Sequence, residues 1–211
     1  MRVEKLTALL ARLHALPRRR LTLVVAVDGL PRSGKTTFTG ALAAADPELD
    51  VVSVDSFYQP DGLTSSPRGG SAADQLTSGL DWRRLRSQVL LPLGRDQAAR
   101  YEILGGEADG PGTWRELPVG GIVLVEGLYA CISQLADLYD FRIWVECPPE
   151  VREQRSRPDR SGRGLDAYLS GHDPVARADL RVDGSGHLPH DLGSEYVRLS
   201  RWPSGPRSRR G

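Results

Sequence analysis

Long hydrophobic runs are missing from this chain of 211 residues. No stretch of about 18 or more apolar residues appears, so nothing has the length of a membrane-spanning helix. The N-terminal segment lacks a secretory cleavage signature and continues into an amphipathic pattern, which predicts a cytoplasmic protein. The formal net charge is only +1, so no global field attracts nucleic acid or an anionic membrane, and neither partner is expected.

Cysteine and lysine are also scarce. Cys131 and Cys147 lie in or beside expected core elements without a CxxC or His-rich companion, which predicts free buried thiols rather than a disulfide or metal site. All of the 28 basic residues except Lys5 and Lys35 are arginine. A lysine at position 35 of so arginine-rich a chain indicates a need for a compact, flexible ammonium group that a planar guanidinium does not meet.

Lys35 belongs to a phosphate-binding motif. Residues 29–36 read Gly-Leu-Pro-Arg-Ser-Gly-Lys-Thr and fit G-x-x-x-x-G-K-[ST], here called the P-loop. An apolar run precedes the P-loop and an alanine-rich segment from Lys35 to Ala45 follows it, which predicts strand, loop and helix. Backbone amides would surround phosphate oxygens, Lys35 would reach the β- and γ-phosphates, and Thr36 would bind Mg²⁺. The predicted nucleotide-binding residues are Gly29, Leu30, Pro31, Arg32, Ser33, Gly34, Lys35, Thr36 and Thr37.

Carboxylates follow two further buried strands. Asp55 comes directly after the short strand expected at 51–54, and Glu126 comes directly after the strand expected at 122–125. In an α/β sheet, ligands bind beyond the carboxyl ends of the strands, so Asp55 should face the same crevice as the P-loop. Glu126 occupies the position of an acid that helps to hold hydrated Mg²⁺, which gives a predicted metal site of Thr36 and Glu126.

The remaining pattern predicts one α/β domain with a helix ahead of it. Helical spacing of leucines favours an amphipathic helix over residues 2–15, within an N-terminal unit of 1–20 that packs on the core. The main domain would cover 21–203, and 204–211 would be a disordered basic tail.

Between the two carboxylate-bearing strands, the sequence predicts loops around one helix. Residues 59–79 indicate a mobile loop because they are rich in Gly, Pro, Ser and Asp. Asp81 is the expected N-cap of a helix that buries Leu85, Val89 and Leu90. Residues 100–112 are expected to form a loop, with a hairpin near 113–117.

Two more strands are expected, at 141–147 and within 178–184. Between them, Pro148 and Pro149 end the first strand and an arginine-rich segment follows. An arginine run is usually a solvated helix face, but this one follows the strand after Glu126, where P-loop kinases have a lid, which favours a short lid at about 150–170. Arginines in a lid can neutralise charge that develops in the transition state and help to exclude water. The arginines of this segment before Gly164 are Arg152, Arg155, Arg157, Arg160 and Arg163.

Several segments, taken in order, resemble the uridine kinase and phosphoribulokinase group of P-loop kinases. The resemblance covers about 21–184, is carried by short motifs, and only the P-loop is specific by itself. The segments that carry it are Val27-Asp28-Gly29, Asp55-Ser56-Phe57-Tyr58, Leu80-Asp81-Trp82, Tyr101-Glu102, Leu124-Val125-Glu126-Gly127, Asp159-Arg160-Ser161-Gly162-Arg163-Gly164 and Ala178-Asp179-Leu180 before Val182-Asp183-Gly184.

This resemblance implies a P-loop NTPase fold, a three-layer α/β/α arrangement with a mainly parallel five-stranded sheet and the short arginine-rich lid. It implies a kinase that moves the γ-phosphoryl of ATP, with Mg²⁺, to a hydroxyl of a small molecule, in uridine kinases the 5′-hydroxyl of a nucleoside. Asp55 matches the acid that accepts the hydroxyl proton, and Tyr58 and Tyr101 match residues of the substrate pocket. With Lys35, the matched lid arginines Arg155 and Arg163 complete the predicted catalytic set.

The acceptor stays open at this point. Ser78 stands nearest to the position where uridine kinases have an aspartate for the ribose hydroxyls, Gly106 replaces a pocket histidine, and Pro158 replaces a lid arginine. A kinase of another alcohol, such as pantothenate, a sugar phosphate or a nicotinamide riboside, is therefore an alternative. A nucleotide-binding switch without kinase activity is another. The sequence does not indicate an oligomeric state.

Overall fold

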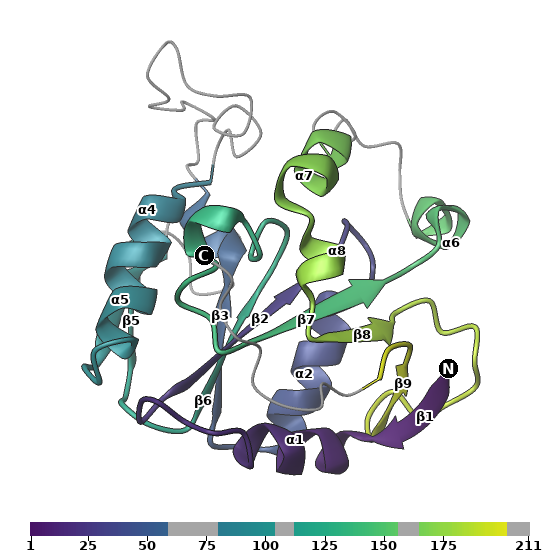
Figure 1. Ribbon diagram of the computed structural model, residues 1–211, viewed down its shortest axis with the longest axis horizontal. Helices are drawn as coiled ribbons and strands as arrows, with labels where there is room; N and C mark the ends of the chain where they lie inside the picture. The colour runs from purple at the N-terminus through teal and green to yellow at the C-terminus, as the bar shows by residue number, and fades with distance from the viewer. Residues whose placement is uncertain (59–79, 104–111, 156–164, 202–211) are drawn as a thin grey trace.

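The structure is a computed structural model that describes residues 1–58, 80–103, 112–155 and 165–201. Within these residues, a seven-stranded sheet in the order β1-β9-β8-β7-β2-β6-β3 forms the centre of the molecule (Figure 1). Its strands are β1 Arg2–Lys5, β2 Leu23–Asp28, β3 Leu49–Ser53, β6 Ile122–Glu126, β7 Phe141–Glu146, β8 Leu180–Asp183 and β9 Glu195–Arg198.

Five neighbouring strands of this sheet, from β8 to β3, are parallel to one another. Val25 in β2 lies opposite Leu124 of β6 on one side and Phe141 of β7 on the other, which fixes the register of the centre. The predicted parallel five-stranded core is thus confirmed. The sheet is larger than predicted, because β9 and β1 extend it as antiparallel strands beyond β8.

Helices cover both faces of the sheet, as the α/β/α prediction requires. The long ones are α1 Leu6–His14, α2 Lys35–Ala45 and α7 Leu165–His172. The shorter helical segments are η1 Val54–Phe57, α4 Trp82–Leu85, η2 Arg86–Leu90, α5 Leu91–Leu93, η3 Ser133–Leu135, α6 Pro149–Gln154 and α8 Pro174–Arg177. In this part of the chain, no helix combines the length and hydropathy needed to cross a bilayer.

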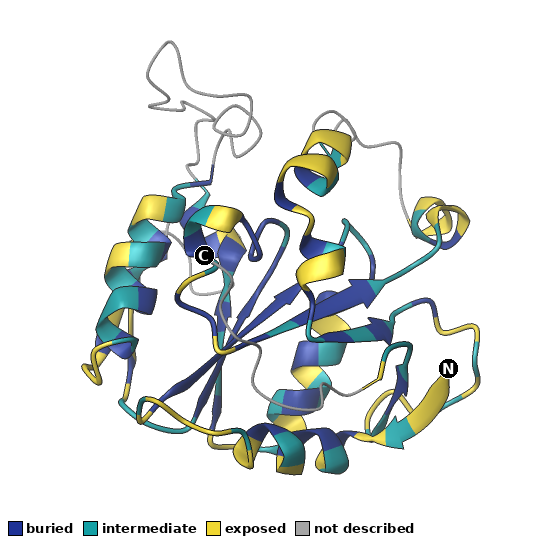
Figure 2. Cartoon of the chain, viewed as in Figure 1, coloured by how far each residue is buried: buried dark blue, intermediate teal, exposed yellow. Residues whose placement is uncertain are grey.

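Successive side chains of β2 point to opposite faces of the sheet, and each face has its own hydrophobic core. Val25 and Val27 face the layer that contains α1 and α2, whereas Val24 and Ala26 face the layer that contains α4 to α5 and α7. All six residues of β2 are buried, as expected for a central parallel strand (Figure 2). The P-loop therefore starts from a fully buried strand in the middle of the sheet.

The N-terminal prediction is partly wrong. Residues 2–5 form β1 instead of the first turn of a helix, and the helix begins only at Leu6. Glu4 pairs with Tyr196 across β1 and β9, so the strand conformation depends on a partner almost 200 residues away. Local periodicity cannot show such a partner. From Leu6 onward the predicted amphipathic helix is correct and buries Leu6, Leu9, Leu10 and Leu13.

Two further strands were missed. Residues 100–102, expected in a loop, belong to β4 Ala99–Glu102, which pairs with β5 Trp114–Leu117 in an antiparallel hairpin. The strand β9 lies where the apolar pattern weakens. The helix start is confirmed, because the Asp81 side chain accepts a hydrogen bond from the Arg84 amide. The predicted loop at 59–79 and the predicted tail at 204–211 lie outside the described residues.

Candidate active site

The P-loop connects the carboxyl end of β2 to the first residue of α2. Gly34 has φ +95°, a conformation that favours glycine, and immediately precedes the helix. A Cβ on Gly29 would lie 2.5 Å from the Val145 carbonyl oxygen and 2.6 Å from Ser33 Oγ, so no side chain fits there. The first amides of α2 have no intrahelical acceptor by geometry, which makes this turn a site for an anion.

Lys35 is enclosed at the bottom of this turn, with 9% of its surface exposed. Its Nζ donates to the carbonyl oxygens of Gly29 at 3.0 Å and Leu30 at 3.2 Å, so the ammonium group folds back over the loop. Burial lowers the pKa of Lys35, and the negative charges of Asp28, Glu126 and Asp55 oppose that shift. These three carboxylates favour the charged form of Lys35, so a positive charge is kept where phosphate would bind.

The two predicted metal ligands are in contact. Thr36 Oγ1 donates to Glu126 Oε1 at 3.2 Å. Glu126 Oε2 is buried and has no hydrogen-bond partner among the described residues. Burial, followed by the negative charge of Asp55, raises the pKa of Glu126, while Lys35 lowers it. A hard cation would satisfy the orphaned oxygen, so this hydroxyl and carboxylate pair fits Mg²⁺.

Asp55 lies in η1, immediately beyond the carboxyl end of β3. Its backbone amide donates to Ser53 Oγ at 3.2 Å, which fixes the turn, and the residue itself is exposed. Its charge acts on both Lys35 and Glu126. The structure therefore brings Asp55 to the same edge of the sheet as the P-loop and the metal pair.

The two predicted pocket tyrosines differ in environment. Tyr58 is half-buried and forms an isolated antiparallel bridge with Leu80. Burial raises its pKa, and the neighbouring Tyr129 adds to the shift. Tyr101 has no exposed surface and stacks on Phe57 with ring centroids 5.3 Å apart. Tyr101 thus packs in the core behind η1, and its contact with a substrate stays a prediction.

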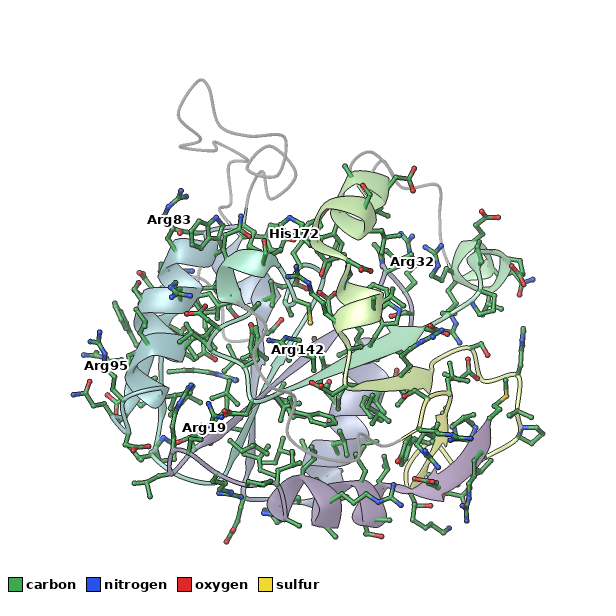
Figure 3. All side chains as sticks on the ribbon, viewed as in Figure 1. Arg19, Arg32, Arg83, Arg95, Arg142 and His172 are labelled. Atoms are coloured by element: carbon green, nitrogen blue, oxygen red, sulfur yellow. The ribbon has the colours of Figure 1, made fainter. Side chains whose placement is uncertain are left out.

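Arg84 supports this side of the site and was missed from sequence. Its guanidinium donates to the carbonyl oxygens of Ser56 at 2.8 Å and Glu102 at 2.6 Å, and it lies 4.7 Å from the centre of the Phe57 ring. It therefore joins η1 to β4. The sequence signal was only its place three residues after the N-cap Asp81, whereas its neighbour Arg83 points outward (Figure 3).

Arg155 is the predicted lid arginine that the structure describes. Its guanidinium donates to the carbonyl oxygens of Gly184 at 2.8 Å, Ser185 at 2.7 Å and Arg32 at 3.1 Å. It thereby joins the end of α6 to the P-loop and to the connection between β8 and β9. Arg163, the other predicted lid residue, lies outside the described residues.

A pocket of about 360 Å³ opens beside the P-loop, and Asp55 is not among the residues that line it. The start of α2 forms one wall and the connection from β8 to β9 forms the other. Phe38 and Tyr196 contribute aromatic rings with centroids 6.2 Å apart. This pocket was missed, because no motif marks its second wall. The residues of that wall are Asp183, Gly184, Gly186, His190, Leu192, Glu195 and Tyr196.

Comparisons with known proteins give structural likeness without a sequence match. No family model and no curated protein sequence matches the chain. A solved structure described as a possible uridine kinase from Bacillus stearothermophilus is similar, with a TM-score of 0.65 and 21% identity over 83% of this chain and 96% of that one. A Silicibacter sp. TM1040 protein, proposed to be a fructose transport system kinase, is similar with a TM-score of 0.56 and 23% identity over 82% and 91% of the two chains. The chain therefore has the fold of these structures, one of which is described as a possible member of the uridine kinase group that its motifs resemble.

Proposed function

We propose that this protein is an ATP-dependent kinase that transfers the γ-phosphoryl group to a hydroxyl of a small molecule, with a nucleoside 5′-hydroxyl as the preferred acceptor. One observation carries the proposal. Thr36 and Glu126 meet at 3.2 Å beside the enclosed ammonium group of Lys35, and the charge of Asp55 acts on this cluster from the neighbouring strand end. Phosphoryl transfer requires mainly positioning and neutralisation of charge, and this cluster offers both.

The donor would bind along the P-loop. Backbone amides at the start of α2 would bind phosphate oxygens, and Lys35 would leave the carbonyl oxygens of Gly29 and Leu30 to bind the β- and γ-phosphates. Thr36 and Glu126 would hold Mg²⁺, which supplies neutralising charge when bound. The pocket lined by Phe38 and Tyr196 is also lined by Lys35 and Thr36, so the nucleoside part of the donor would lie in it.

The acceptor would approach from the side of Asp55. Its hydroxyl oxygen forms a bond to the γ-phosphorus, the bond from that phosphorus to the bridging oxygen of ADP breaks, and the hydroxyl proton passes to the Asp55 carboxylate. Asp55 suits this role because it is exposed, lies at a strand end and is held by a turn. Arg155, already anchored on Arg32 and Gly184, would add positive charge near the phosphates.

A sugar is the alternative acceptor. One similar structure is described as a possible uridine kinase and another is proposed to be a fructose transport system kinase, so the fold is compatible with both kinds of alcohol. We would incubate the protein with MgATP and a panel of uridine, cytidine, fructose, pantothenate and nicotinamide riboside, and identify phosphorylated products by mass spectrometry. A product with a sugar alone would replace the nucleoside proposal. Binding of ATP without any product would favour a nucleotide-binding switch.

The role of Asp55 gives the sharper test. Asp55→Asn should lower turnover by about 10² to 10⁴-fold, the usual contribution of a general base, while ATP binding is retained. Asp50→Asn makes the same chemical change near the opposite end of β3 and should leave turnover unchanged. Equal turnover in Asp55→Asn and the wild type would rule out the proton-accepting role.

A further inference from the structure

A buried carboxylate at the end of β2 is not used in the proposed transfer. Asp28 has no exposed surface, yet its carboxylate accepts hydrogen bonds from three different parts of the chain. Oδ1 accepts from the Gly29 amide at 2.6 Å, and Oδ2 accepts from the Cys131 amide at 2.8 Å. Oδ2 also accepts from the hydroxyl of Tyr168 in α7. Gly29 is the first residue of the P-loop, so one side chain connects the P-loop to α7.

The helix α7 depends on few contacts. Of its eight residues, Tyr168 and His172 are the buried ones, and they share one face because they are four positions apart. Most of the remaining surface of α7 is exposed or half-exposed (Figure 2). Leu169 also packs against the core, so three side chains hold this helix, and Tyr168 and His172 are the two whose polar atoms are enclosed.

Both buried side chains of α7 make polar contacts outside the helix, Tyr168 with Asp28 of β2 and His172 with Ser133 of η3. His172 Nδ1 accepts from the Ser133 amide at 3.1 Å and lies 2.9 Å from Ser133 Oγ. The Tyr168 ring meets Tyr129 edge-on, with centroids 4.8 Å apart. Tyr129 and Ser133 belong to the segment that follows Glu126. Asp28 and Tyr168 therefore connect α7, the segment after the metal-side acid and the P-loop.

Asp28 also acts on the charge of the site. Its carboxylate is the first of the three negative charges that oppose the lowering of the Lys35 pKa by burial. Burial raises the pKa of Asp28, and its three hydrogen-bond donors and the charge of Lys35 oppose that shift. One of these donors, the Tyr168 hydroxyl, would be lost if α7 moved away. A buried carboxylate oxygen left short of a donor is costly. The position of α7 and the geometry of the P-loop are thus expected to depend on each other.

We propose that Asp28 is a positioning residue that couples the seating of α7, through Tyr168, to the conformation of the P-loop. The helix α7 contains the C-terminal part of the segment predicted as the lid, at about 150–170. Only the purpose of this coupling rests on the proposed function: a seated α7 would hold the P-loop in the conformation that binds a nucleotide. The contacts that make the coupling are present in the protein without a ligand.

Hydrogen exchange of the intact protein, followed by mass spectrometry, tests this coupling. Tyr168→Phe removes one oxygen from α7 and should increase exchange of the P-loop amides by about tenfold, although the substitution lies far from them in sequence. Tyr139→Phe is the matched control. Tyr139 is also a buried tyrosine, and its hydroxyl has no hydrogen-bond partner among the described residues, so exchange of the P-loop should stay at the wild-type rate.

Asp28→Asn gives the reciprocal measurement. It should increase exchange across α7, and the double variant with Tyr168→Phe should exceed the stronger single variant by much less than the product of the two effects. Wild-type exchange of the P-loop in Tyr168→Phe, or effects that multiply in the double variant, would overturn the coupling. Tyr168→Phe decides the question if Asp28→Asn does not fold.

A second arm with MgATP separates this proposal from the proposed function. The nucleotide should protect the P-loop and α7 of the wild type together, and Tyr168→Phe should weaken the protection of α7. A wild type that shows no response to MgATP would contradict nucleotide binding, while the comparison without ligand would still decide the coupling. Product formation from any acceptor is not needed for either measurement.

Discussion

The donor side and the acceptor side of the candidate site are built in different ways. On the donor side, the P-loop is one contiguous segment between a fully buried strand and a helix, and it packs against backbone atoms of Val145 in β7 and of Gly184 after β8. On the acceptor side, Asp55, Tyr58 and Tyr101 come from two separate segments at the β3 edge of the sheet. Arg84 from a third segment joins those two.

Under the proposed function, the donor side supports phosphoryl transfer, and the acceptor side determines which alcohol is bound. Phosphate binding needs amides, a lysine and a metal pair at fixed places, and the central strands supply those places. Recognition of the acceptor depends on side chains that longer connections bring together, so it can change while the donor side stays the same. Substitutions on the donor side should therefore have large effects for any acceptor, and those on the acceptor side should have smaller, acceptor-dependent effects.

The largest effect is expected from Lys35→Arg, which keeps the charge and changes its shape. The ammonium group lies 3.0 Å from the Gly29 carbonyl oxygen in a site that leaves 9% of the residue exposed, so a guanidinium should not reach the phosphates in the same way. Turnover should fall by roughly 10² to 10³-fold, as for the loss of one preorganised donor. Steady-state kinetics with any accepted alcohol measures it.

Lys5→Arg is the matched control, because Lys5 pairs with Glu195 at 2.7 Å near the protein surface. It should turn over like the wild type. Full activity of Lys35→Arg would contradict the role of a compact ammonium group and would remove the main distinction between the two sides of the site.

The second effect concerns close packing behind the P-loop. A Cβ on Gly184 would lie 1.8 Å from the Ser33 carbonyl oxygen, so Gly184→Ala must displace the P-loop or β8. We expect a loss of roughly 1 to 3 kcal/mol in the free energy of unfolding, as for other overpacked sites. Affinity for ATP should also fall, which urea denaturation and calorimetric titration would measure separately.

Gly40→Ala makes the same change in α2, where a Cβ would meet nothing within 4 Å. It should stabilise the protein by roughly 0.5 to 1 kcal/mol, because glycine is unfavourable inside a helix. A destabilising Gly40→Ala, or a neutral Gly184→Ala, would show that the packing seen around the P-loop does not limit its backbone.

The donor side could be predicted well from sequence because its information is local. The P-loop, the helix Lys35–Ala45 and the carboxylates after two strands were identified from neighbouring residues, and the structure places Thr36 beside Glu126. The five parallel strands followed from short apolar runs. In each case the pattern and the element are parts of the same segment.

The rest depends on contacts between distant segments. Residues 2–5 form a strand because β9 pairs with them, and β9 itself is a short edge element. No role was predicted for Arg84, and Asp28 was noted only as part of the Val27-Asp28-Gly29 segment. Their partners Ser56 and Tyr168 are 28 and 140 positions away. The pocket wall at 183–196 has no motif of its own. Such features follow from tertiary packing rather than from periodicity.

A smaller effect is expected on the acceptor side, where the two tyrosines can be compared directly. Tyr58→Phe should raise the KM of the acceptor about fivefold, the usual contribution of one neutral hydrogen bond, because Tyr58 is half-buried beside Asp55. Tyr101→Phe should leave that KM unchanged, because Tyr101 has no exposed surface. An increase in the KM of the acceptor for Tyr101→Phe alone would mean that the acceptor binds deeper, next to Phe57.

The smallest effect is expected at the far edge of the sheet, where Glu4 supports the donor pocket from behind. Its carboxylate accepts from the Tyr196 hydroxyl at 2.8 Å and pairs with Arg198 at 2.9 Å and Arg12 at 2.8 Å. Burial raises the pKa of Glu4, but these hydrogen bonds and charges outweigh burial and hold it below its ordinary value of 4.5.

Because the folded-state pKa of Glu4 is lowered, its stabilising contribution is complete above pH 4.5 and is lost as the pH falls through the folded-state value. Glu4→Gln should therefore lower the thermal unfolding midpoint at neutral pH, and its difference from the wild type should shrink in acid. Glu48→Gln, at the exposed turn before β3, should show no difference at either pH. A gap between Glu4→Gln and the wild type that stays constant into acid would mean that the carboxylate charge does not hold β1, β9 and the pocket wall together.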